Sequence, residues 1–376
     1  MLNRATGTVV EILAVRPGAV EIEVEIGGGR AKAIAYTVLV AEPGVGDRVV
    51  LNTTAVDLDL GTGGYHFVIE NLSAPCPPTS NLQPPTSGSG HVMKLRYTPA
   101  QLAVLAVEED DSPHRAAIDA FRSLEKMPVI VGQLHSQVAP AAAAVKRLTQ
   151  PRARVVYVMT DSAALPIAFS RIVAQMKDAG LLDATITAGQ AFGGDFESVT
   201  VHTALIAARA VAGADVTIVC QGPGNVGTGT KYGFSGIEQG EIINAVNALG
   251  GTAIAIPRIS FADPRPRHRG ISHHTITALA EIALTQAIIP LPMIDQTQLF
   301  TIEEQIGRTA IAYKHRTRVF DGLPGIRECA ERGITLTTMG RSFNEDPEFF
   351  LAASAAGAAA ADVLKGAGGR GSGVGG

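Results

Sequence analysis

The sequence contains no tryptophan, and aromatic residues make up only 5% of its 376 residues. Proteins that bind single-stranded nucleic acid stack the bases on aromatic side chains, so this scarcity of rings disfavours that class. Lys, Arg, Asp and Glu together account for 18% of the residues, and the formal net charge is −4. No basic field covers the chain, and we expect no nucleic-acid partner unless a local basic patch supplies the contact.

Cysteine and long apolar runs are also scarce. Cys76, Cys220 and Cys329 lie far apart and form no CxxC pair, which fits a reducing compartment better than a disulfide framework. The N-terminal residues MLNRATGTVVEIL lack the apolar segment of a signal peptide, so we expect a cytoplasmic location. The longest apolar run, residues 349–361, is short and alanine-rich. It predicts a packed terminal helix and no membrane partner.

What is present at the N-terminus is β-structure. Residues 19–26 alternate between apolar residues and glutamates, Gly27-Gly28-Gly29 can turn the chain, and residues 30–36 return with basic side chains. Further candidate strands cover residues 8–13, 48–52 and 65–70. Five short strands with glycine-rich turns predict a small OB- or SH3-like β-barrel over residues 1–72.

The remaining chain divides into a linker, a large domain and a tail. Residues 73–91 are rich in Pro, Ser and Gly and predict a linker, and residues 366–376 predict a disordered glycine-rich tail. Between them, over residues 92–365, short β-branched runs alternate with helical patterns. These runs cover residues 129–131, 155–159, 184–187, 216–220, 252–256 and 334–338. The pattern predicts an α/β ligand-binding domain with a Rossmann-like, three-layer parallel sheet.

Polar residues follow these strands where each one ends. In chain order they are His135, Asp161, the motif around Asp195, a glycine-rich stretch beginning at Gly222, and an arginine-rich stretch beginning at Arg258. In an open α/β sheet, ligands bind outside the carboxyl ends of the strands. We therefore expect these loops to converge on one ligand site.

The glycine-rich stretch reads GPGNVGTGTK over residues 222–231. It contains G-x-G-x-x-G, but the next helix begins near Ser235 and Arg258 stands where a dinucleotide site needs an acid, so the Rossmann fingerprint is incomplete. The spacing also departs from a P-loop. Backbone amides of such a loop can still form an anion-binding nest, although a long flexible loop is the alternative. The candidate cofactor-binding residues are Gly222, Gly224, Gly227, Gly229 and Lys231.

Residues 258–274 hold four arginines and one aspartate in an otherwise neutral domain. The planar guanidinium fork pairs with phosphate or carboxylate, which predicts an anionic ligand. A solvated basic loop or a weak RNA patch is the alternative. The candidate substrate-binding residues are Arg258, Arg265, Arg267, Arg269 and His135.

The histidines in the same stretch are candidates for proton transfer or metal binding. Ser272 predicts a helix N-cap that places His273 and His274 in the first turn, where the helix dipole favours neutral imidazole. A metal site would use His268, His273 or His274 with Asp263 or Asp161. Adjacent helical residues point about 100° apart, so we do not expect His273 and His274 to share one ion. Structural or exposed histidines are the alternative.

Three acids complete the candidate catalytic set of His273, His274, Asp161, Asp195 and Glu238. Each acid also fits a structural role. Asp161 can cap a helix, and Asp195 lies in the turn Gly193-Gly194-Asp195. Ser235 and Glu238 have the spacing of a capping box, which would use the carboxylate at a helix terminus.

Three long motifs resemble a known family. They are QAFGGDFE (190–197), the glycine-rich stretch extended to Glu241, and PRISFADPRPRHRGISHH (257–274). Together they are similar to domain-of-unknown-function family 3866, found in actinobacteria and Firmicutes. The resemblance spans residues 1 to about 365 and implies a bacterial origin, but no established activity or catalytic residues.

We therefore expect an enzyme, a hydrolase or group transferase, acting on a small anionic and phosphate-bearing metabolite. A divalent metal or a nucleotide is left open as the cofactor, and a homo-oligomer as the assembly. The alternatives are a non-catalytic nucleotide or metabolite sensor, and an RNA-associated protein that uses the barrel and the arginine-rich loop.

Overall fold

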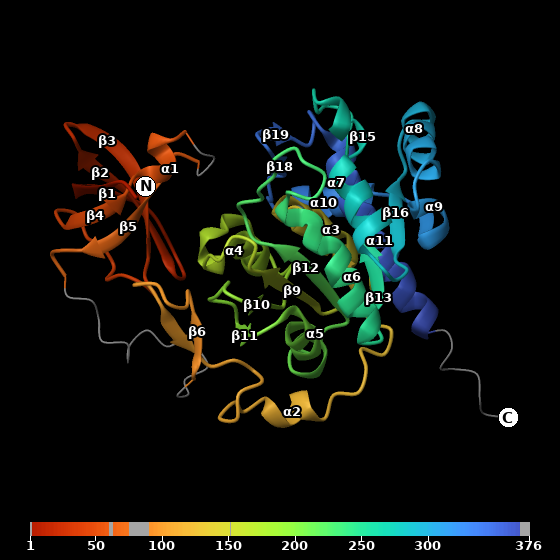
Figure 1. Cartoon of the computed structure of the whole chain (residues 1–376), viewed down its shortest axis with the longest axis horizontal. Coiled ribbons are helices and arrows are strands. Elements are labelled where there is room, and N and C mark those ends of the chain that lie inside the picture. The colour runs from red at the N-terminus through yellow and green to blue at the C-terminus, as the bar shows by residue number, and fades with distance from the viewer. Residues whose placement is uncertain (1, 60–62, 75–89, 151, 369–376) are drawn as a thin grey trace.

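The computed structural model describes residues 2–59, 63–74, 90–150 and 152–368. It consists of a small β-barrel followed by a larger α/β domain (Figure 1). Most of the predicted linker, Cys76 and the end of the predicted tail lie outside the described residues.

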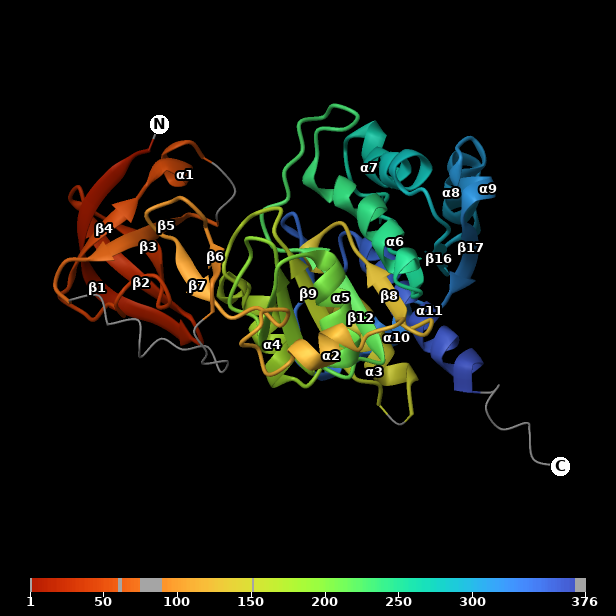
Figure 2. The same cartoon turned by 60° about the horizontal axis from the view of Figure 1, so that its bottom comes forward.

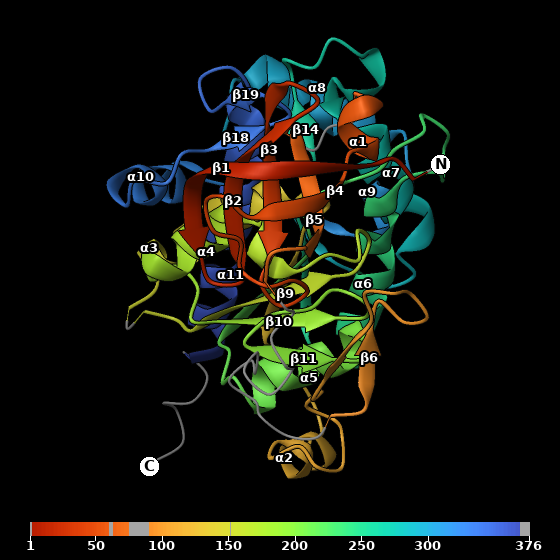
Figure 3. The same cartoon turned by 90° about the vertical axis from the view of Figure 1, so that its left-hand side faces the viewer.

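The N-terminal barrel is closed by five strands in the order β1-β2-β3-β5-β4, with β1 also pairing with β4. The strands are β1 (Arg4–Arg16), β2 (Ala19–Ile26), β3 (Gly29–Tyr36), β4 (Arg48–Asn52) and β5 (Tyr65–Asn71), with α1 (Thr54–Asp57) before β5. Val20, Ile22 and Val24 of β2 fill the barrel core, as the alternating pattern predicts. Figure 3 shows the barrel strands in front of the α/β domain.

A buried carboxylate joins the barrel to the α/β domain. Glu21 is only 3% exposed. It accepts hydrogen bonds from Arg16 of the barrel, from Tyr65 Oη at 2.8 Å and from Arg171 Nε at 2.6 Å. Arg16 Nε also donates to the Ala168 carbonyl at 2.8 Å. The glutamate therefore faces a second domain rather than solvent, which the alternating pattern alone could not show.

The α/β domain is built on eight parallel strands in the order β11-β10-β9-β12-β8-β13-β16-β17. These strands are β8 (Pro128–Val131), β9 (Val155–Thr160), β10 (Ala184–Ala188), β11 (Phe196–Ser198), β12 (Val216–Gln221), β13 (Thr252–Ala255), β16 (Ile288–Pro292) and β17 (Arg316–Phe320). The run at residues 334–338 is not part of this sheet, and β16 and β17 replace it at one edge. The sequence did not predict these two strands, because β16 contains proline and β17 contains exposed arginines, so neither is a continuous apolar run.

Helices cover both faces of the sheet. One face carries α5 (Val201–Ala210) and α6 (Glu238–Ala248), and the other carries α3 (Val138–Leu148), α4 (Arg171–Asp178), α10 (Leu323–Glu331) and α11 (Pro347–Gly368). Successive residues of β8 alternate between the two cores, with Val129 and Val131 in one and Ile130 in the other. Figure 3 shows α3 and α10 on one side of the molecule and α6 on the other. The fold is a three-layer, Rossmann-like α/β domain, as predicted.

The described chain also contains smaller strands and α-helices. They are β6 (Val92–Lys94), β7 (Leu102–Val104), α2 (Arg115–Asp119), β14 (Ile259–Ser260), β15 (Gly270–Ile271), α7 (His273–Thr277), α8 (Gln296–Gly307), α9 (Ile311–Lys314), β18 (Thr337–Thr338) and β19 (Arg341–Ser342).

The terminal helix α11 is longer than the sequence predicts. Its segment Pro347–Gly366 is long and apolar enough to cross a membrane by length and composition, with a mean hydropathy of 1.3. Within the fold, 67% of its apolar window is buried, and it packs against α3 and α10. This is the arrangement of a core helix.

A buried ion pair fastens the chain after the linker to the α/β domain. Lys94, the last residue of β6, is 0% exposed, and its Nζ lies 3.1 Å from Glu197 Oε2, whose side chain is 2% exposed. Lys94 Nζ also donates to the carbonyls of Gly189 at 2.8 Å and Ala191 at 3.0 Å. Glu197 accepts from Thr187 Oγ1 at 2.7 Å. These contacts fix the loop that follows β10.

Candidate functional site

The topology places a switch point between β8 and β12. The two strands are parallel neighbours, but β8 leads into α3 on one face of the sheet and β12 leads into α6 on the other. Open α/β sheets bind ligands at such a point, outside the carboxyl ends of the strands. We call the region formed by the segments that follow β8, β9, β12 and β13 the crevice. The candidate site is built around this crevice.

Three glutamines line the crevice. Gln133 follows β8, accepts from Thr275 Oγ1 through its Oε1 at 2.8 Å, and accepts from Gln221 Nε2 through its carbonyl at 2.6 Å. Gln239 Nε2 donates to the carbonyls of Val131 and Ile256 at 2.8 and 2.9 Å. Gln221 Oε1 and Gln239 Oε1 are buried and have no partner among the described residues. The crevice thus offers polar atoms that the fold itself does not use.

The glycine-rich loop forms a hairpin-like excursion. Gly227 and Phe234 form an antiparallel bridge, and Thr228 N donates to the Gly233 carbonyl at 2.9 Å. Val226 N donates to Ser235 Oγ at 3.0 Å. These amides are therefore used within the loop. Figure 2 shows the loop between β12 and α6 extending beside α7.

Lys231 is held away from the crevice at the tip of this loop. Its Nζ lies 2.7 Å from Glu281 Oε1, and Tyr232 Oη donates to Glu281 Oε2 at 2.6 Å. Glu281 lies after α7, 50 positions from Lys231, so the sequence did not indicate this pairing.

The glycine-rich and arginine-rich loops lie against each other. A Cβ on Gly227 would lie 3.3 Å from the His274 ring, and one on Gly229 would lie 3.5 Å from Arg267 Nη2. Phe234 stacks on His274, with ring centroids 4.0 Å apart and an angle of 9°. Of the loops that the sequence predicts to converge, these two therefore meet. Gly227 is tightly packed, and Gly229 has a φ of +79°, which favours glycine.

Positive charge exceeds negative charge in the arginine-rich loop. Asp263 is buried and pairs with Arg265 at 2.7 Å and Arg258 at 3.3 Å, and Arg341 Nη2 lies 4.0 Å from it. The hydrogen bonds from Arg265 hold the pKa of Asp263 well below its usual range, and burial lowers the pKa of Arg258 to about 10. Arg341 also pairs with Asp346 at 2.9 Å. Three guanidinium groups thus share two carboxylates.

Arg267 and Arg269 differ from the other loop arginines. Arg267 is exposed and has no hydrogen-bond or ion-pair partner among the described residues. Arg269 donates to the Phe261 carbonyl at 3.2 Å and lines a separate hollow of about 380 Å³ against α8. Of the two, only Arg267 lies against the glycine-rich loop. Asp263, with its oxygens taken by arginines, is not placed as a metal ligand.

The three histidines of the loop gather beside Arg267. His268, His273 and His274 bring their ring nitrogens within 4.8 Å of one another, and the His273 and His274 ring centroids are 4.1 Å apart. The expectation that adjacent helical histidines diverge was wrong here, because the rings turn toward each other at the start of α7. Burial, and then the neighbouring positive charge of Arg258, lowers the pKa of His268 to about 3.

Glu238 occupies the opposite wall of the crevice, at the first residue of α6. Its carboxyl oxygens accept from Thr160 Oγ1 at 2.6 Å and Ser162 Oγ at 3.0 Å, the residues at and just after the end of β9. The predicted capping box is absent, since Ser235 bonds to Asn225 and Val226 instead. Burial raises the pKa of Glu238 to about 7, and the two hydroxyl hydrogen bonds only partly oppose this shift.

Two of the remaining candidates are structural. Asp195 accepts from Thr185 N at 2.8 Å and pairs with Lys177 at 2.5 Å. The register sets it beside the amino-terminal half of β10, away from the crevice. His135 has both nitrogens occupied, by Tyr157 Oη at 3.1 Å and Ser170 Oγ at 2.6 Å. Burial lowers the pKa of His135 to about 4.

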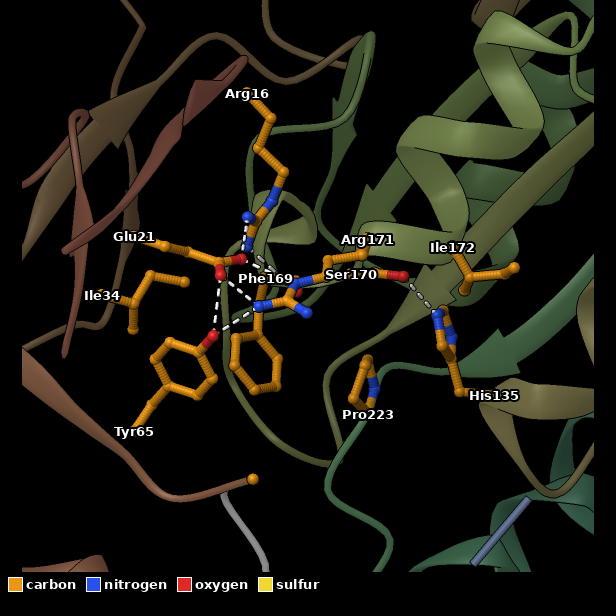
Figure 4. Close-up of a pocket in the computed structure, with 11 residues that line it drawn as sticks. Arg16, Glu21, Ile34, Tyr65, His135, Phe169, Ser170, Arg171, Ile172 and Pro223 are labelled. Carbon is orange, nitrogen blue, oxygen red and sulfur yellow. Dashed lines mark hydrogen bonds and ion pairs between the residues drawn. The ribbon is translucent and has the colours of Figure 1, made fainter. Parts of the chain in front are cut away.

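His135 and Ser170 belong to a different hollow. A cavity of about 270 Å³ opens between the barrel and the α/β domain, with the Arg16–Glu21–Arg171 network on its barrel side and His135 in its far wall (Figure 4). Pro223, next to the first glycine of the glycine-rich stretch, also lines it. The sequence did not indicate this cavity, because its walls come from both domains.

Asp161 lies at the carboxyl edge but is tied to a turn. Its Oδ2 accepts from Gln190 N at 2.9 Å, and Gly189, with φ of +66°, passes so close that a Cβ would lie 2.2 Å from that oxygen. We expect Gly189→Ala to lower the free energy of unfolding by about 2–3 kcal/mol, combining left-handed backbone strain with the clash. Urea unfolding measures the change.

Gly333→Ala is the matched control for this substitution. Gly333 has a similar φ of +69° with nothing within 4 Å of its Cβ position, so it should show the backbone cost alone, about 1–2 kcal/mol. Equal losses in the two variants would contradict the close approach of Asp161.

Several site residues were not among the candidates assigned a role from the sequence. They are Gln133, Gln221, Thr160, Ser162 and Arg341. The first four lie at the end of a strand or just after it, and Arg341 lies in a loop that returns to the site. That criterion could have found the first four but not Arg341.

Comparison with known proteins places the chain in one family. The profile of a family described as "Protein of unknown function (DUF3866)" matches residues 32–357. No curated protein and no solved structure matches the chain. The matched region runs from the third barrel strand into α11 and includes every residue of the crevice. The chain therefore belongs to the DUF3866 family.

Proposed function

We propose that this protein is an enzyme that hydrolyses or transfers a phosphate-bearing group of a small anionic metabolite at the switch-point crevice. The observation that carries the proposal is the surplus of guanidinium charge at this crevice. Arg258, Arg265 and Arg341 share only two carboxylates, and Arg267 has no partner among the described residues. A guanidinium fork without a carboxylate is the group best suited to hold a phosphate.

Arg267 is the residue assigned to the anion. Its guanidinium is exposed and lies beside Gly229, where a Cβ would be 3.5 Å from Nη2. Arg265 and Arg258 are already engaged by Asp263, so they support the positive potential rather than supply free donors. Arg269, which faces α8, is not part of the proposed anion site.

Glu238 is the residue assigned to proton transfer. A carboxyl with a pKa of about 7 is partly protonated at neutral pH and can serve as a general acid. In hydrolysis of a phosphate ester, water oxygen forms the new bond to phosphorus and the bond to the leaving oxygen breaks. Glu238 gives its proton to that leaving oxygen and recovers one proton from the attacking water.

A non-catalytic sensor is the second candidate, and a specific connection favours it. The segment after β9 carries Ser162, which bonds to Glu238, and continues to Ala168 and Arg171, which contact the barrel. Occupancy of the crevice could be relayed to the barrel by this segment. Binding without turnover would select this candidate, and steeply salt-dependent RNA binding would select an RNA-associated role instead.

The proposal is tested by a thermal-shift screen with nucleotides, sugar phosphates and inorganic phosphate. A ligand that binds only the folded state raises the apparent Tm. We expect at least one phosphate compound to do so, and Arg267→Ala to weaken its binding about 10–100-fold, the cost of a charge-assisted hydrogen bond. Release of inorganic phosphate, or transfer of the group to an acceptor, then shows turnover.

Arg122→Ala is the matched control for the arginine. Arg122 is exposed, lies beyond α2 and bonds only to carbonyls of its own segment among the described residues. Stabilisation that is lost equally in both variants, or is unchanged in Arg267→Ala, would contradict the assignment of the anion to Arg267.

A further inference from the structure

The local chain path brings the three histidines together. His268 ends the short turn Pro266–His268, Gly270–Ile271 pairs with β14, and His273 and His274 then open α7. The ring centroids are 4.9 Å apart for His268 and His273 and 5.1 Å apart for His268 and His274. Their ligand nitrogens all lie within 4.8 Å of one another. Three imidazoles thus surround one point.

These nitrogens are buried without partners. His274 is 7% exposed, and its Nε2 has no hydrogen bond among the described residues; the same is true of His273 Nε2. A buried polar atom without a partner costs free energy. A ligand bound between His273 and His274 would give both atoms a partner and would remove this cost.

A second contact prepares His268 for the same role. His268 is 2% exposed, and its Nδ1 lies 2.8 Å from Ser272 Oγ. A proton on Nδ1 that is donated to this hydroxyl leaves the Nε2 lone pair free. Metal-binding histidines are oriented by a hydrogen bond of this kind. Ser272 also caps α7, so one residue sets both the helix start and the ring.

We propose that His268, His273 and His274 bind one divalent ion of the zinc class. Imidazole nitrogen suits Zn²⁺, Co²⁺ and Ni²⁺, whereas Mg²⁺ and Ca²⁺ take oxygen ligands. Three protein ligands leave the fourth tetrahedral position open, which is the pattern of zinc sites that take water or substrate. Asp263 is excluded from the ligand set, because its oxygens are engaged by arginines.

The surrounding charge determines what occupies the open position. The three imidazoles carry no negative charge, and the loop already holds more guanidinium groups than carboxylates. A dication adds to this positive potential, so the fourth ligand is an anion. This part of the inference rests on the proposed function. It requires the metal and the anion to strengthen each other's binding by the same factor.

The metal is tested on the full chain, free of any histidine tag and first dialysed against a chelator. Wild-type protein should bind one equivalent of Zn²⁺, and Co²⁺ should give the visible absorption of a tetrahedral nitrogen site. We expect His273→Gln and His274→Ala each to weaken Zn²⁺ binding at least about 100-fold, as loss of one of three ligands. His202→Ala, at an exposed histidine on α5, should bind as wild type.

Wild-type protein that binds no Zn²⁺ or Co²⁺ would overturn the metal site, whether or not the variants fold. Equal weakening in His202→Ala would overturn it as well. His273 is the half-buried member of the cluster, so His273→Gln should stay folded even if loss of the His274–Phe234 stack unfolds the other variant.

Titration of inorganic phosphate with and without Zn²⁺ separates this inference from the proposed function. The expected result is tighter phosphate binding in the presence of the metal, and loss of this coupling in Arg267→Ala. Zinc binding without any phosphate effect would leave the metal site in place and overturn the anion site. Phosphate binding and turnover in a chain that takes no metal would do the reverse.

Discussion

Lys94→Met should lower the free energy of unfolding by about 3–5 kcal/mol, because it leaves the Glu197 carboxylate buried without its counter-ion. The carbonyls of Gly189 and Ala191 lose their donor at the same time. Burial already raises the pKa of Glu197, and Lys94 is the main charge that opposes this shift. Urea unfolding followed by circular dichroism measures the loss.

Two comparisons separate the buried pair from a general effect of removing a lysine. Lys177→Met removes a similar contact to Asp195, but those side chains are 40% and 33% exposed, so the expected loss is below about 1 kcal/mol. Adding Glu197→Gln to Lys94→Met should recover part of the stability, because no unpaired charge remains buried. Equal losses for the two lysine variants would contradict the role assigned to the pair.

Glu238→Gln should reduce kcat about 10²–10⁴-fold on any phosphate compound that the enzyme turns over, the usual contribution of a positioned general acid. Glutamine keeps hydrogen-bond acceptance from Thr160 and Ser162 possible through its Oε1, but it cannot release a proton. Because Glu238 acts in its protonated form, wild-type activity should fall as the pH rises through about 7. That limb of the pH profile should be absent from the residual activity of the variant.

The same substitution has a pH-dependent effect on stability that needs no substrate. The folded-state pKa of Glu238 is raised above its usual value, so the folded chain binds the proton more tightly than the unfolded chain. Its contribution to stability is complete below the unfolded pKa and is lost as the pH rises toward 7. Glu238→Gln should therefore be more stable than wild type at pH 8 by about 1–3 kcal/mol, and little changed at pH 4.5.

Glu241→Gln is the control on the same helix. Glu241 is exposed one turn beyond Glu238, and its charge raises the pKa of Glu238 less than burial does. Its neutralisation removes the same formal charge and should give a much smaller gain at pH 8. A gain in the free energy of unfolding that is equal in both variants, or equal at pH 4.5 and pH 8, would show that the pKa of Glu238 is not raised in the folded chain.

The outline of the fold could be predicted because it depends on local periodicity. Alternation in residues 19–26 places Val20, Ile22 and Val24 in the barrel core, and β-branched runs such as Val155–Thr160 are buried on both faces. The strands at the sheet edge could not be predicted in this way. Arg316–Phe320 is largely exposed, so it lacks the apolar pattern of a central strand.

The meeting of the glycine-rich and arginine-rich loops could also be predicted, but the side-chain pairings around it could not. Parallel strands bring their carboxyl ends to one edge, which is why Gly229 and Arg267 meet although they lie 38 positions apart in the sequence. The ion pairs join side chains from segments that are far apart in the sequence, and no local sequence pattern connects such segments. Lys231 bonds to Glu281, and Asp195 bonds to Lys177 beside the other end of β10.

The sequence by itself determined that a barrel precedes a parallel α/β sheet and that polar loops follow the strands of this sheet. Alternating burial in the barrel strands and continuous burial in the sheet strands are both properties of a single short segment. Only the tertiary structure decided that Glu238 is held by the end of β9, that Arg267 has no partner among the described residues, and that three histidines face one point. Side-chain partners and desolvation are set by neighbours far apart in the chain, and these neighbours exist only once the chain is folded.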